Sequence, residues 1–200
     1  AAHAMTAGSP LVSIITPCYN AGAYLPDTIA SVLGQSFTDW EWVVTDDCST
    51  DTSPDLISAI SDERVRLIRL TTNSGAPAAY NSSLDHARGR FITFIDADDA
   101  WNSSFLAVML DAMGRRGDEL AYCGYSRCDQ HLQPMLSDFR ATQDVTFNSL
   151  LRTCRLSTLA TVYDSRRIGK IRFPLDSKRE DHAMWLSVLS KIPVGRAVDQ

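Results

Sequence analysis

The stretch that decides the fold is Phe91-Ile92-Thr93-Phe94-Ile95-Asp96-Ala97-Asp98-Asp99. Its first five residues are apolar or β-branched without polar alternation, which is typical of a strand buried on both faces of a sheet. The four residues that follow hold three carboxylates. A buried strand that ends in an acidic loop indicates a covered sheet with a polar site at one edge.

Strand-like and helix-like segments alternate on both sides of this stretch. Short apolar runs predict strands, and apolar residues at helical spacing predict helices. The predicted strands are residues 11–15, 40–44, 65–70, 91–95, 120–125 and 159–163, and the predicted helices are residues 24–35, 53–60, 77–87, 105–113, 147–154 and one from about residue 180. A polar, irregular segment is expected over residues 129–144.

This alternation predicts an α/β fold with a mostly parallel central sheet and helices on both faces. We expect a single domain over residues 10–200 with a further C-terminal part beyond it, and we interpret residues 1–9 as a cloning remnant or loose start. Ligands in such folds bind beyond the carboxyl ends of the strands. The loops after the strands are therefore where a site is expected.

Three of these loops are unusually polar. They are Thr16-Pro17-Cys18-Tyr19-Asn20, Asp46-Asp47-Cys48-Ser49-Thr50-Asp51 and Asp96-Ala97-Asp98-Asp99. On a shared edge of a parallel sheet they would bring several carboxylates together, and a divalent cation is the simplest relief of that repulsion. Taken singly, the acidic loops also fit helix capping and the first loop fits a turn. Their joint position favours a ligand site.

The composition excludes several classes of protein. The chain has 200 residues, a formal net charge of −5, 44% hydrophobic residues and no basic run, so nucleic-acid binding is not expected. The five cysteines match no zinc pattern and are expected to be reduced, which favours a cytoplasmic location. The sequence contains neither an apolar run of membrane-spanning length nor a signal peptide.

Six segments, in order along the chain, resemble motifs of glycosyltransferase family 2. They are Val12–Asn20 (VSIITPCYN), Ser31–Phe37 (SVLGQSF), Asp46–Thr52 (DDCSTDT), Asn73–Gly75 (NSG), Phe94–Asp99 (FIDADD) and Glu180-Asp181-His182 with Trp185-Leu186. One motif would be a weak signal, but the ordered set covers about residues 11–190. The overall pattern most resembles bacterial enzymes that build cell-surface polysaccharides such as teichuronic acid or lipopolysaccharide.

The resemblance implies a GT-A fold, the Rossmann-like fold of nucleotide-diphospho-sugar transferases. It implies a metal-dependent, inverting transfer of a sugar from a nucleotide-diphosphate donor, expected to be a UDP-sugar, to a hydroxyl of a glycan or lipid-linked acceptor. Mn²⁺ or Mg²⁺ is the implied cofactor. Such enzymes often work in the cytoplasm at the inner face of the membrane, and the sequence leaves an oligomer open.

The resemblance also implies which residues hold the nucleotide. The implied nucleotide-binding set is Pro17, Tyr19, Asn20, Asp46, Asp47, Asn73, Gly75, Asp96 and Ala97. Within it, Pro17, Tyr19 and Asp47 would surround a uracil-type base, and Asp96 would contact the ribose. Asp46 would be a neighbour rather than a direct contact.

Metal binding and catalysis are assigned by the same resemblance. Asp98 would bind the metal that bridges the diphosphate, and Asp99 would support it or face the sugar. Asp181 would be the general base, with Glu180 as a less favoured substitute. A metal ion neutralises charge on the leaving diphosphate, and the acceptor hydroxyl needs a carboxylate to take its proton. Without the resemblance, this acidic pair would be interpreted as charge bias at a helix start.

One position departs from the family pattern. Many relatives have an arginine that helps hold the donor in an "ARN" segment after the NxG turn, whereas this chain has Ala78-Ala79-Tyr80-Asn81. Tyr80 can donate a hydrogen bond or stack but supplies no charge, which puts more weight on the metal. His182 and Trp185 are interpreted as structural, with a ligand role and a sugar-stacking role as the respective alternatives. Acceptor and sugar contacts are expected within residues 125–144.

Other classes of protein fit less well. A phosphatase with an Asp-x-Asp nucleophile would carry that motif after the first strand, where this chain has Pro17-Cys18-Tyr19-Asn20. The glycine-rich phosphate loops of nucleotidyltransferases and dehydrogenases are absent from the sequence. The remaining alternative is a nucleotide-sugar-binding module without catalytic activity. The presence of Asp181 argues against it.

Overall fold

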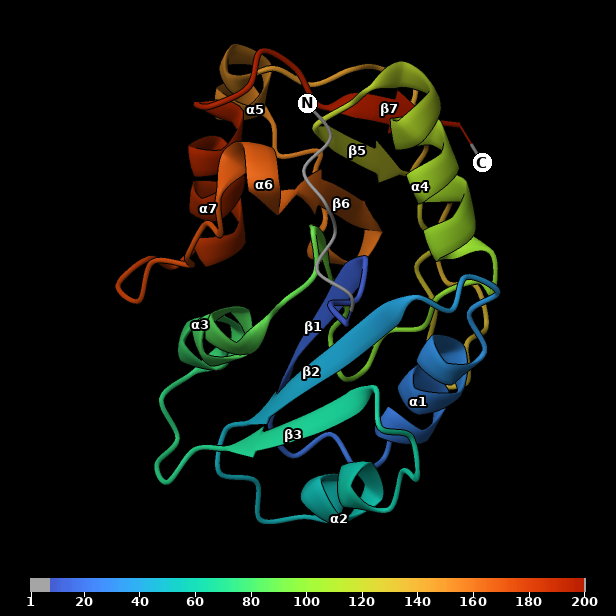
Figure 1. Cartoon of the computed structure of the whole chain (residues 1–200), viewed down its shortest axis with the longest axis vertical. Helices are drawn as coiled ribbons and strands as arrows, with labels where there is room; N and C mark the ends of the chain where they lie inside the picture. Colours follow the sequence, from blue (N-terminus) through green and yellow to red (C-terminus); the bar gives the residue numbers. More distant parts are fainter. Residues whose placement is uncertain (1–7, 200) are drawn as a thin grey trace.

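The computed structural model describes residues 8–199, which form an α/β fold around one sheet of seven strands (Figure 1). The strands are β1 (Val12–Cys18), β2 (Trp40–Asp46), β3 (Val65–Arg69), β4 (Phe91–Phe94), β5 (Leu120–Cys123), β6 (Thr161–Asp164) and β7 (Arg196–Val198). Their order across the sheet is β3-β2-β1-β4-β6-β5-β7. All neighbouring pairs are parallel except those of β6, which runs antiparallel to both β4 and β5.

Helices cover both faces of this sheet. They are α1 (Leu25–Leu33), α2 (Ser53–Ser58), α3 (Ala76–His86), α4 (Phe105–Arg116), α5 (Phe147–Arg152), α6 (Ser165–Ile168) and α7 (Glu180–Leu189), with a short 3-10 helix η1 (Thr158–Ala160). Figure 1 shows α1 and α4 on one side of the sheet and α3, α6 and α7 on the other. Each side encloses its own apolar core, one around Trp42 and Met109 and the other around Phe94 and Trp185. Among residues 8–199, no helix is both long enough and apolar enough to cross a membrane.

The predicted fold class, with a mostly parallel sheet covered on both faces, is confirmed. Each predicted strand and helix is present with its ends shifted by at most three residues, as where residues 105–113 extend to Arg116 in α4. The sequence analysis missed α6 and β7, which have four and three residues and are too short to show a period. Residues 1–7, interpreted as part of a remnant or loose start, lie outside the described residues.

The register of the strands places the polar loops at one edge of the sheet. Cys18 at the end of β1 lies opposite Asp46 at the end of β2, and Ile15 lies opposite Phe94 at the end of β4. Because the three strands are parallel, the segments that follow them leave the sheet on the same side. The common edge predicted from the sequence is therefore confirmed.

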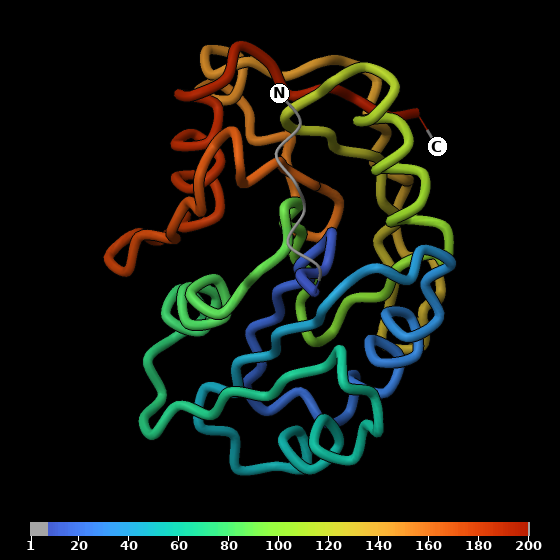
Figure 2. The backbone as a smooth tube through the Cα atoms, in the orientation of Figure 1, coloured from blue at the N-terminus to red at the C-terminus, as the bar shows by residue number. Residues whose placement is uncertain are grey.

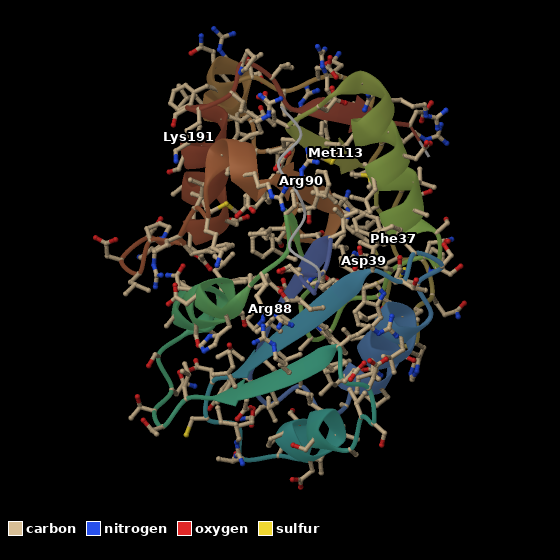
Figure 3. The ribbon with its side chains drawn as sticks, in the orientation of Figure 1. Phe37, Asp39, Arg88, Arg90, Met113 and Lys191 are labelled. Carbon is tan, nitrogen blue, oxygen red and sulfur yellow. The ribbon has the colours of Figure 1, made fainter. Side chains whose placement is uncertain are left out.

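At the other end of β1 and β2, the buried carboxylate of Glu41 links neighbouring segments by hydrogen bonds. Glu41 in β2 is 1% exposed, and its oxygens accept hydrogen bonds from the Ser13 hydroxyl at 2.6 Å and from Arg66 and Arg88 at 2.9 Å each. Figure 3 shows Arg88 beside β2. Burial opposes ionisation, but the hydrogen bonds from Ser13 and Arg88 outweigh it and lower the pKa of Glu41. This stabilisation is present at neutral pH and is lost as the pH falls through that lowered pKa.

Gly89 lies where the chain enters β4, in direct contact with β1. A Cβ at this position would meet the backbone nitrogen of Ser13 at 2.4 Å and the carbonyl carbon of Val12 at 2.6 Å. Backbone cannot move aside cheaply, so Gly89→Ala is expected to lower the free energy of unfolding by about 2–3 kcal/mol in urea denaturation. Gly114→Ala in α4 is the matched control, because its Cβ would meet nothing within 4 Å. A Gly89→Ala variant as stable as Gly114→Ala would contradict this packing argument.

The segment between β5 and α5 has no helix or regular strand. Isolated bridges pair Tyr125 with Phe139 and Cys128 with Pro134, which makes the segment a loose hairpin. In Figure 2 this yellow-to-gold part of the tube runs alongside α4. The predicted irregular segment over residues 129–144 is confirmed.

Candidate active site

A cleft of about 530 Å³ opens at the edge where β1, β2 and β4 end. It is lined by Pro17, Cys18, Tyr19, Asn20, Ala21, Tyr24, Asp47, Ala76, Ala79, Tyr80, Asp96, Ala97, Asp98, Thr158, Lys178, Glu180 and Asp181. The structure therefore gathers most of the predicted site residues, from distant parts of the sequence, around one cleft. Four predicted residues are not among its lining residues, namely Asp46, Asn73, Gly75 and Asp99.

The loop after β2 holds the loop after β1 by its backbone. The Ser49 hydroxyl accepts from the amide of Asn20 at 2.9 Å, and the Ser53 hydroxyl accepts from the next amide at 2.9 Å. The Asp51 carboxylate accepts from the amide of Gly22 at 2.8 Å. In return, the Asn20 side chain accepts from the amide of Thr50 at 2.9 Å. Ser49 and Asp51 of the second acidic loop, with Ser53 at the start of α2, thus hold the segment after β1, and none of the three lines the cleft.

Asp47 holds the backbone of the turn before α3 in the same way, by accepting hydrogen bonds from its amides. Its two oxygens accept from the amides of Ser74 at 2.8 Å and Gly75 at 2.7 Å. Gly75 has φ +86°, a conformation that favours glycine, and it precedes the first residue of α3. The Asn73-Ser74-Gly75 motif therefore fixes α3 against the cleft, and its effect on a ligand is indirect. Asp47 also lines the cleft.

Asp46 is fully buried and lies away from the cleft. Its carboxylate accepts from the amide of Ser49 at 3.3 Å and lies 3.5 Å from Nε of Arg69. Of two adjacent aspartates, strand alternation turns one into the protein and leaves the other at the rim. The structure thus agrees with the interpretation of Asp46 as a neighbour rather than a direct contact.

Tyr80, which is buried, and Asp96, which is half-buried, form a hydrogen-bonded pair at the floor of the cleft. The Tyr80 hydroxyl donates to a carboxylate oxygen of Asp96, and its ring stacks on Phe173 with centroids 4.2 Å apart. Burial raises the pKa of Asp96 to about 6; the Tyr80 hydrogen bond opposes that rise, and the charges of nearby carboxylates add to it. Where many relatives were expected to have an arginine, this chain has Tyr80, an uncharged side chain whose hydroxyl donates its hydrogen bond to Asp96.

Asp98 and Asp99 occupy different environments. Asp98 is exposed and lines the cleft, whereas Asp99 is half-buried behind it. Burial, together with the charges of Asp96 and Asp98, raises the pKa of Asp99 to about 7. The Thr28 hydroxyl donates to the carbonyls of Ala97 at 3.0 Å and Asp99 at 2.8 Å, which fixes this acidic turn to α1.

The opposite wall of the cleft is the start of α7. Glu180 and Asp181 lie in its first turn and line the cleft. His182 points elsewhere, because its Nε2 lies 2.9 Å from the carbonyl oxygen of Leu150. Trp185 is fully buried and packs edge-on against Phe94 at 5.9 Å. The structural interpretation of His182 and Trp185 is supported, and the sugar-stacking alternative for Trp185 is wrong.

Several lining residues were not predicted from the sequence, among them four with polar or reactive side chains, Cys18, Tyr24, Thr158 and Lys178. Cys18 was visible within the first motif, but burial raises the pKa of its thiol to about 11, so it is protonated at neutral pH. Like the other four cysteines it is free, as predicted. Lys178 lies in an irregular segment and Thr158 begins the three-residue helix η1, and neither segment has a sequence pattern that could have marked these residues.

Comparison with known proteins decides the family. Residues 13–171 match the family model described as Glycosyl transferase family 2. The chain belongs to glycosyl transferase family 2. The predicted membership of this family is thereby confirmed.

Two relatives illustrate where this glycosyltransferase lies within the family. It is 39% identical over 189 residues to TuaG of Bacillus subtilis, provisionally assigned as a teichuronic acid biosynthesis glycosyltransferase, covering 94% of this chain and 75% of that protein. It is 36% identical over 179 residues to WfgD of Escherichia coli, covering 90% of this chain and 70% of that protein. WfgD is a UDP-Glc:alpha-D-GlcNAc-diphosphoundecaprenol beta-1,3-glucosyltransferase.

Solved structures confirm the GT-A fold of this glycosyltransferase. TarS 1–349 of S. aureus in complex with UDP has a TM-score of 0.77 at 24% identity, covering 93% of this chain and 56% of that one. The mannosyltransferase PcManGT of Pyrobaculum calidifontis, in complex with GDP-Man and Mn²⁺, has a TM-score of 0.68 at 21% identity, covering 97% of this chain and 55% of that one. The glycosyltransferase described here thus spans little more than half of these solved chains.

The carboxylates of the cleft suit a metal ion that is bound together with the phosphate oxygens of a substrate. No group of three or more His, Cys, Asp or Glu side chains within residues 8–199 is arranged to hold a metal by itself. Mg²⁺ in phosphate-handling enzymes is usually bound by one or two carboxylates together with phosphate oxygens and water. The exposed carboxylate of Asp98, with Asp99 behind it, fits that kind of site and does not fit an all-protein cage.

A second cleft of about 500 Å³ lies directly beside the first. The two clefts share η1, since Thr158 lines the first and Leu159 and Ala160 line the second. They also share the loop after β4, whose later residues Ala100 and Trp101 face the second cleft. The hairpin after β5 closes its far side with a stacked aromatic pair whose ring centroids are 5.0 Å apart.

Proposed function

We propose that this glycosyltransferase moves a sugar from a UDP-sugar to a hydroxyl of a glycan or lipid-linked acceptor, with inversion at the anomeric carbon, in the synthesis of a cell-surface polysaccharide. The observation that supports this most is that one cleft is lined by Asp96 and Asp98 on one wall and by Asp181 on the other. The names of TuaG and WfgD support the pathway, and the UDP complex of TarS supports the nucleotide.

The base and ribose would bind along the β1 and β2 loops. Tyr19 is 52% exposed and lines the cleft with Pro17, so its ring face is available to a uracil ring. Each oxygen of Asp47 accepts one backbone amide, which leaves lone pairs for a base N–H. Asp96 has one oxygen on the Tyr80 hydroxyl, and its other oxygen would accept from a ribose hydroxyl.

The diphosphate and its metal would lie at Asp98. A Mn²⁺ or Mg²⁺ ion held there would neutralise charge on the departing diphosphate. Asp99 would support the ion from behind. Burial and then the charges of Asp96 and Asp98 raise the pKa of Asp99, and a cation would relieve the repulsion among these carboxylates. The Thr28 hydrogen bonds hold the backbone of this turn in place for that role.

Asp181 would take the proton of the acceptor hydroxyl. It lies in the first turn of α7, and Trp185 one turn later anchors the helix in the core. Attack from the Asp181 wall on a donor held at the opposite wall would invert the anomeric centre. Glu180 lines the same cleft and is the less favoured base.

The acceptor would enter through the second cleft. Its aromatic faces and polar side chains suit a saccharide, and it is lined by Tyr125, Ser126, Cys128, Asp138, Phe139, Arg140 and Ala141 from the segment where acceptor contacts were predicted. A lipid-linked acceptor would bring the enzyme to the inner face of the membrane.

This acceptor assignment predicts the effect of removing one ring. Phe139→Ala is expected to raise KM for the acceptor roughly tenfold, equivalent to about 1.4 kcal/mol, without changing the affinity for UDP. Leu136→Ala is the matched control, since Leu136 is 58% exposed in the same hairpin and does not line the cleft. Steady-state kinetics with varied acceptor measure it. An unchanged acceptor KM in Phe139→Ala would remove the second cleft from the proposal.

The experiment that tests the proposed function is a donor and acceptor screen. The protein is incubated with Mn²⁺, a panel of UDP-sugars including UDP-glucose and UDP-N-acetylglucosamine, and a short lipid-diphosphate-linked sugar. Release of UDP that depends on the acceptor, together with a product heavier by one sugar in mass spectrometry, is the expected result. Binding of UDP-sugars without any product would instead favour the alternative, a nucleotide-sugar-binding module without catalytic activity.

A further inference from the structure

The lining of the donor cleft is strongly unbalanced in charge. Five carboxylates line it, those of Asp47, Asp96, Asp98, Glu180 and Asp181. A nucleoside diphosphate carries several negative charges of its own, and such a group is repelled by a cleft of like sign. Among the lining residues that the structure describes, Lys178 is the single lysine or arginine.

The Lys178 ammonium is not committed to another group. Within residues 8–199 it makes no ion pair and no hydrogen bond, although it stands three residues before Asp181. Arg69 lies 3.5 Å from Asp46 and does not line the cleft. Arg179 follows Lys178 directly in the sequence, but it does not line the cleft either. An exposed, uncommitted cation beside several carboxylates is placed to meet an anionic ligand.

Tyr80 cannot take over this task. Its hydroxyl donates to Asp96, and its ring is held between Phe173, stacked at 4.2 Å, and Phe94, edge-on at 5.6 Å. The floor of the cleft therefore offers a neutral donor that is already engaged. Among the lining residues that the structure describes, positive charge comes only from Lys178.

We propose that Lys178 binds the diphosphate of the donor and stays on the nucleoside diphosphate as it leaves. This inference rests on the proposed function. The acceptor oxygen forms its bond to the anomeric carbon while the bond between that carbon and the diphosphate oxygen breaks. The electron pair of the broken bond stays on the diphosphate oxygen, and the proton of the acceptor hydroxyl passes to Asp181. The Lys178 ammonium balances the new charge on the diphosphate as a point charge, the way lysine usually binds phosphate.

The test compares three ligands on three variants by titration calorimetry in Mn²⁺. The ligands are UDP, uridine and inorganic pyrophosphate, and the variants are Lys178→Met, Lys178→Arg and Lys170→Met. Lys170 is the matched control, because it is exposed in the same segment between α6 and α7 but does not line the cleft. In Lys178→Met we expect UDP and pyrophosphate to bind roughly tenfold more weakly and uridine to bind unchanged. Lys178→Arg should recover most of the loss, and Lys170→Met should show none.

Three outcomes would overturn the inference. Equal affinity of Lys178→Met and the wild-type protein for UDP and pyrophosphate would do so, as would a parallel loss for uridine, which would signal a change in cleft shape. An equal loss in Lys170→Met would show a general charge effect. Failure of the proposed function is distinguishable, because then the wild-type protein would not bind UDP, while pyrophosphate would still report on Lys178. A wild-type protein that binds neither would remove both proposals.

Discussion

Replacing Asp181 with asparagine is expected to slow sugar transfer by roughly 100- to 10,000-fold, the range that a positioned general base contributes. The amide has nearly the shape of the carboxylate but cannot accept the proton of the acceptor hydroxyl. UDP should bind Asp181→Asn at least as tightly as the wild-type protein, because a negative charge has left the cleft that Asp181 lines. Transfer assays and calorimetry on the same preparation measure the two effects.

Two further variants sharpen this result. Asp176→Asn is the matched control, since Asp176 is exposed five residues earlier and does not line the cleft. Glu180→Gln tests the neighbouring carboxylate of the same helical turn. Transfer that survives in Asp181→Asn and disappears in Glu180→Gln would reassign the base to Glu180. Unchanged transfer in both would remove α7 from the chemistry.

Removing divalent cations is expected to weaken UDP binding by about tenfold or more, because the cleft lining offers five carboxylates against one lysine. Calorimetry with Mn²⁺, with Mg²⁺ and with a chelator measures it. Asp98→Asn should lose most of the difference between metal and chelator, whereas Asp176→Asn should keep it. Equal UDP affinity in metal and in chelator would refute metal dependence at this site.

The metal effect should also depend on pH. Asp96 and Asp99 have pKa values raised to about 6 and about 7, mainly by burial, above the ordinary value of about 3.9 for an aspartate in an unfolded chain. Between these values the folded protein keeps protons that the unfolded chain has lost, so the free energy of unfolding falls as the pH rises from about 4 to about 7. A cation relieves the repulsion that develops there. Thermal stabilisation by Mn²⁺ with UDP should therefore be larger at about pH 8 than at about pH 5.5.

The local sequence pattern was sufficient to predict the strands and loops that form the site. The buried strands and the polar loops after them can be recognised because burial on both faces leaves continuous apolar runs. The direction of β6 could not be predicted, since an antiparallel strand inserted between β4 and β5 has the same local pattern as a parallel one. The four residues of α6 and three of β7 carry no detectable period.

The sequence predicted which loops form the site better than it predicted what each side chain in those loops contacts. Ser49 and Asp51 belong to a recognisable motif, yet their partners are backbone amides of the preceding loop, a tertiary pairing that sequence spacing does not contain. For Ser49 and Asp51, the interpretation as helix caps was closer to the structure than the interpretation as ligand contacts, because capping side chains also accept hydrogen bonds from backbone amides. Lys178 was missed for the opposite reason, since only the path of an irregular segment brings it to the cleft.

The backbone clamp made by Ser49, Asp51 and Ser53 has a thermodynamic consequence. Because the β1 and β2 loops are tied together before any ligand arrives, binding a nucleotide base there should cost little conformational entropy. The wall at residues 174–178 makes no hydrogen bond to another strand or helix within the described chain. The ordering cost of a bound donor should thus fall on the phosphate and sugar side of the cleft. Donors that share a base but differ in their sugars should then differ mainly in binding entropy.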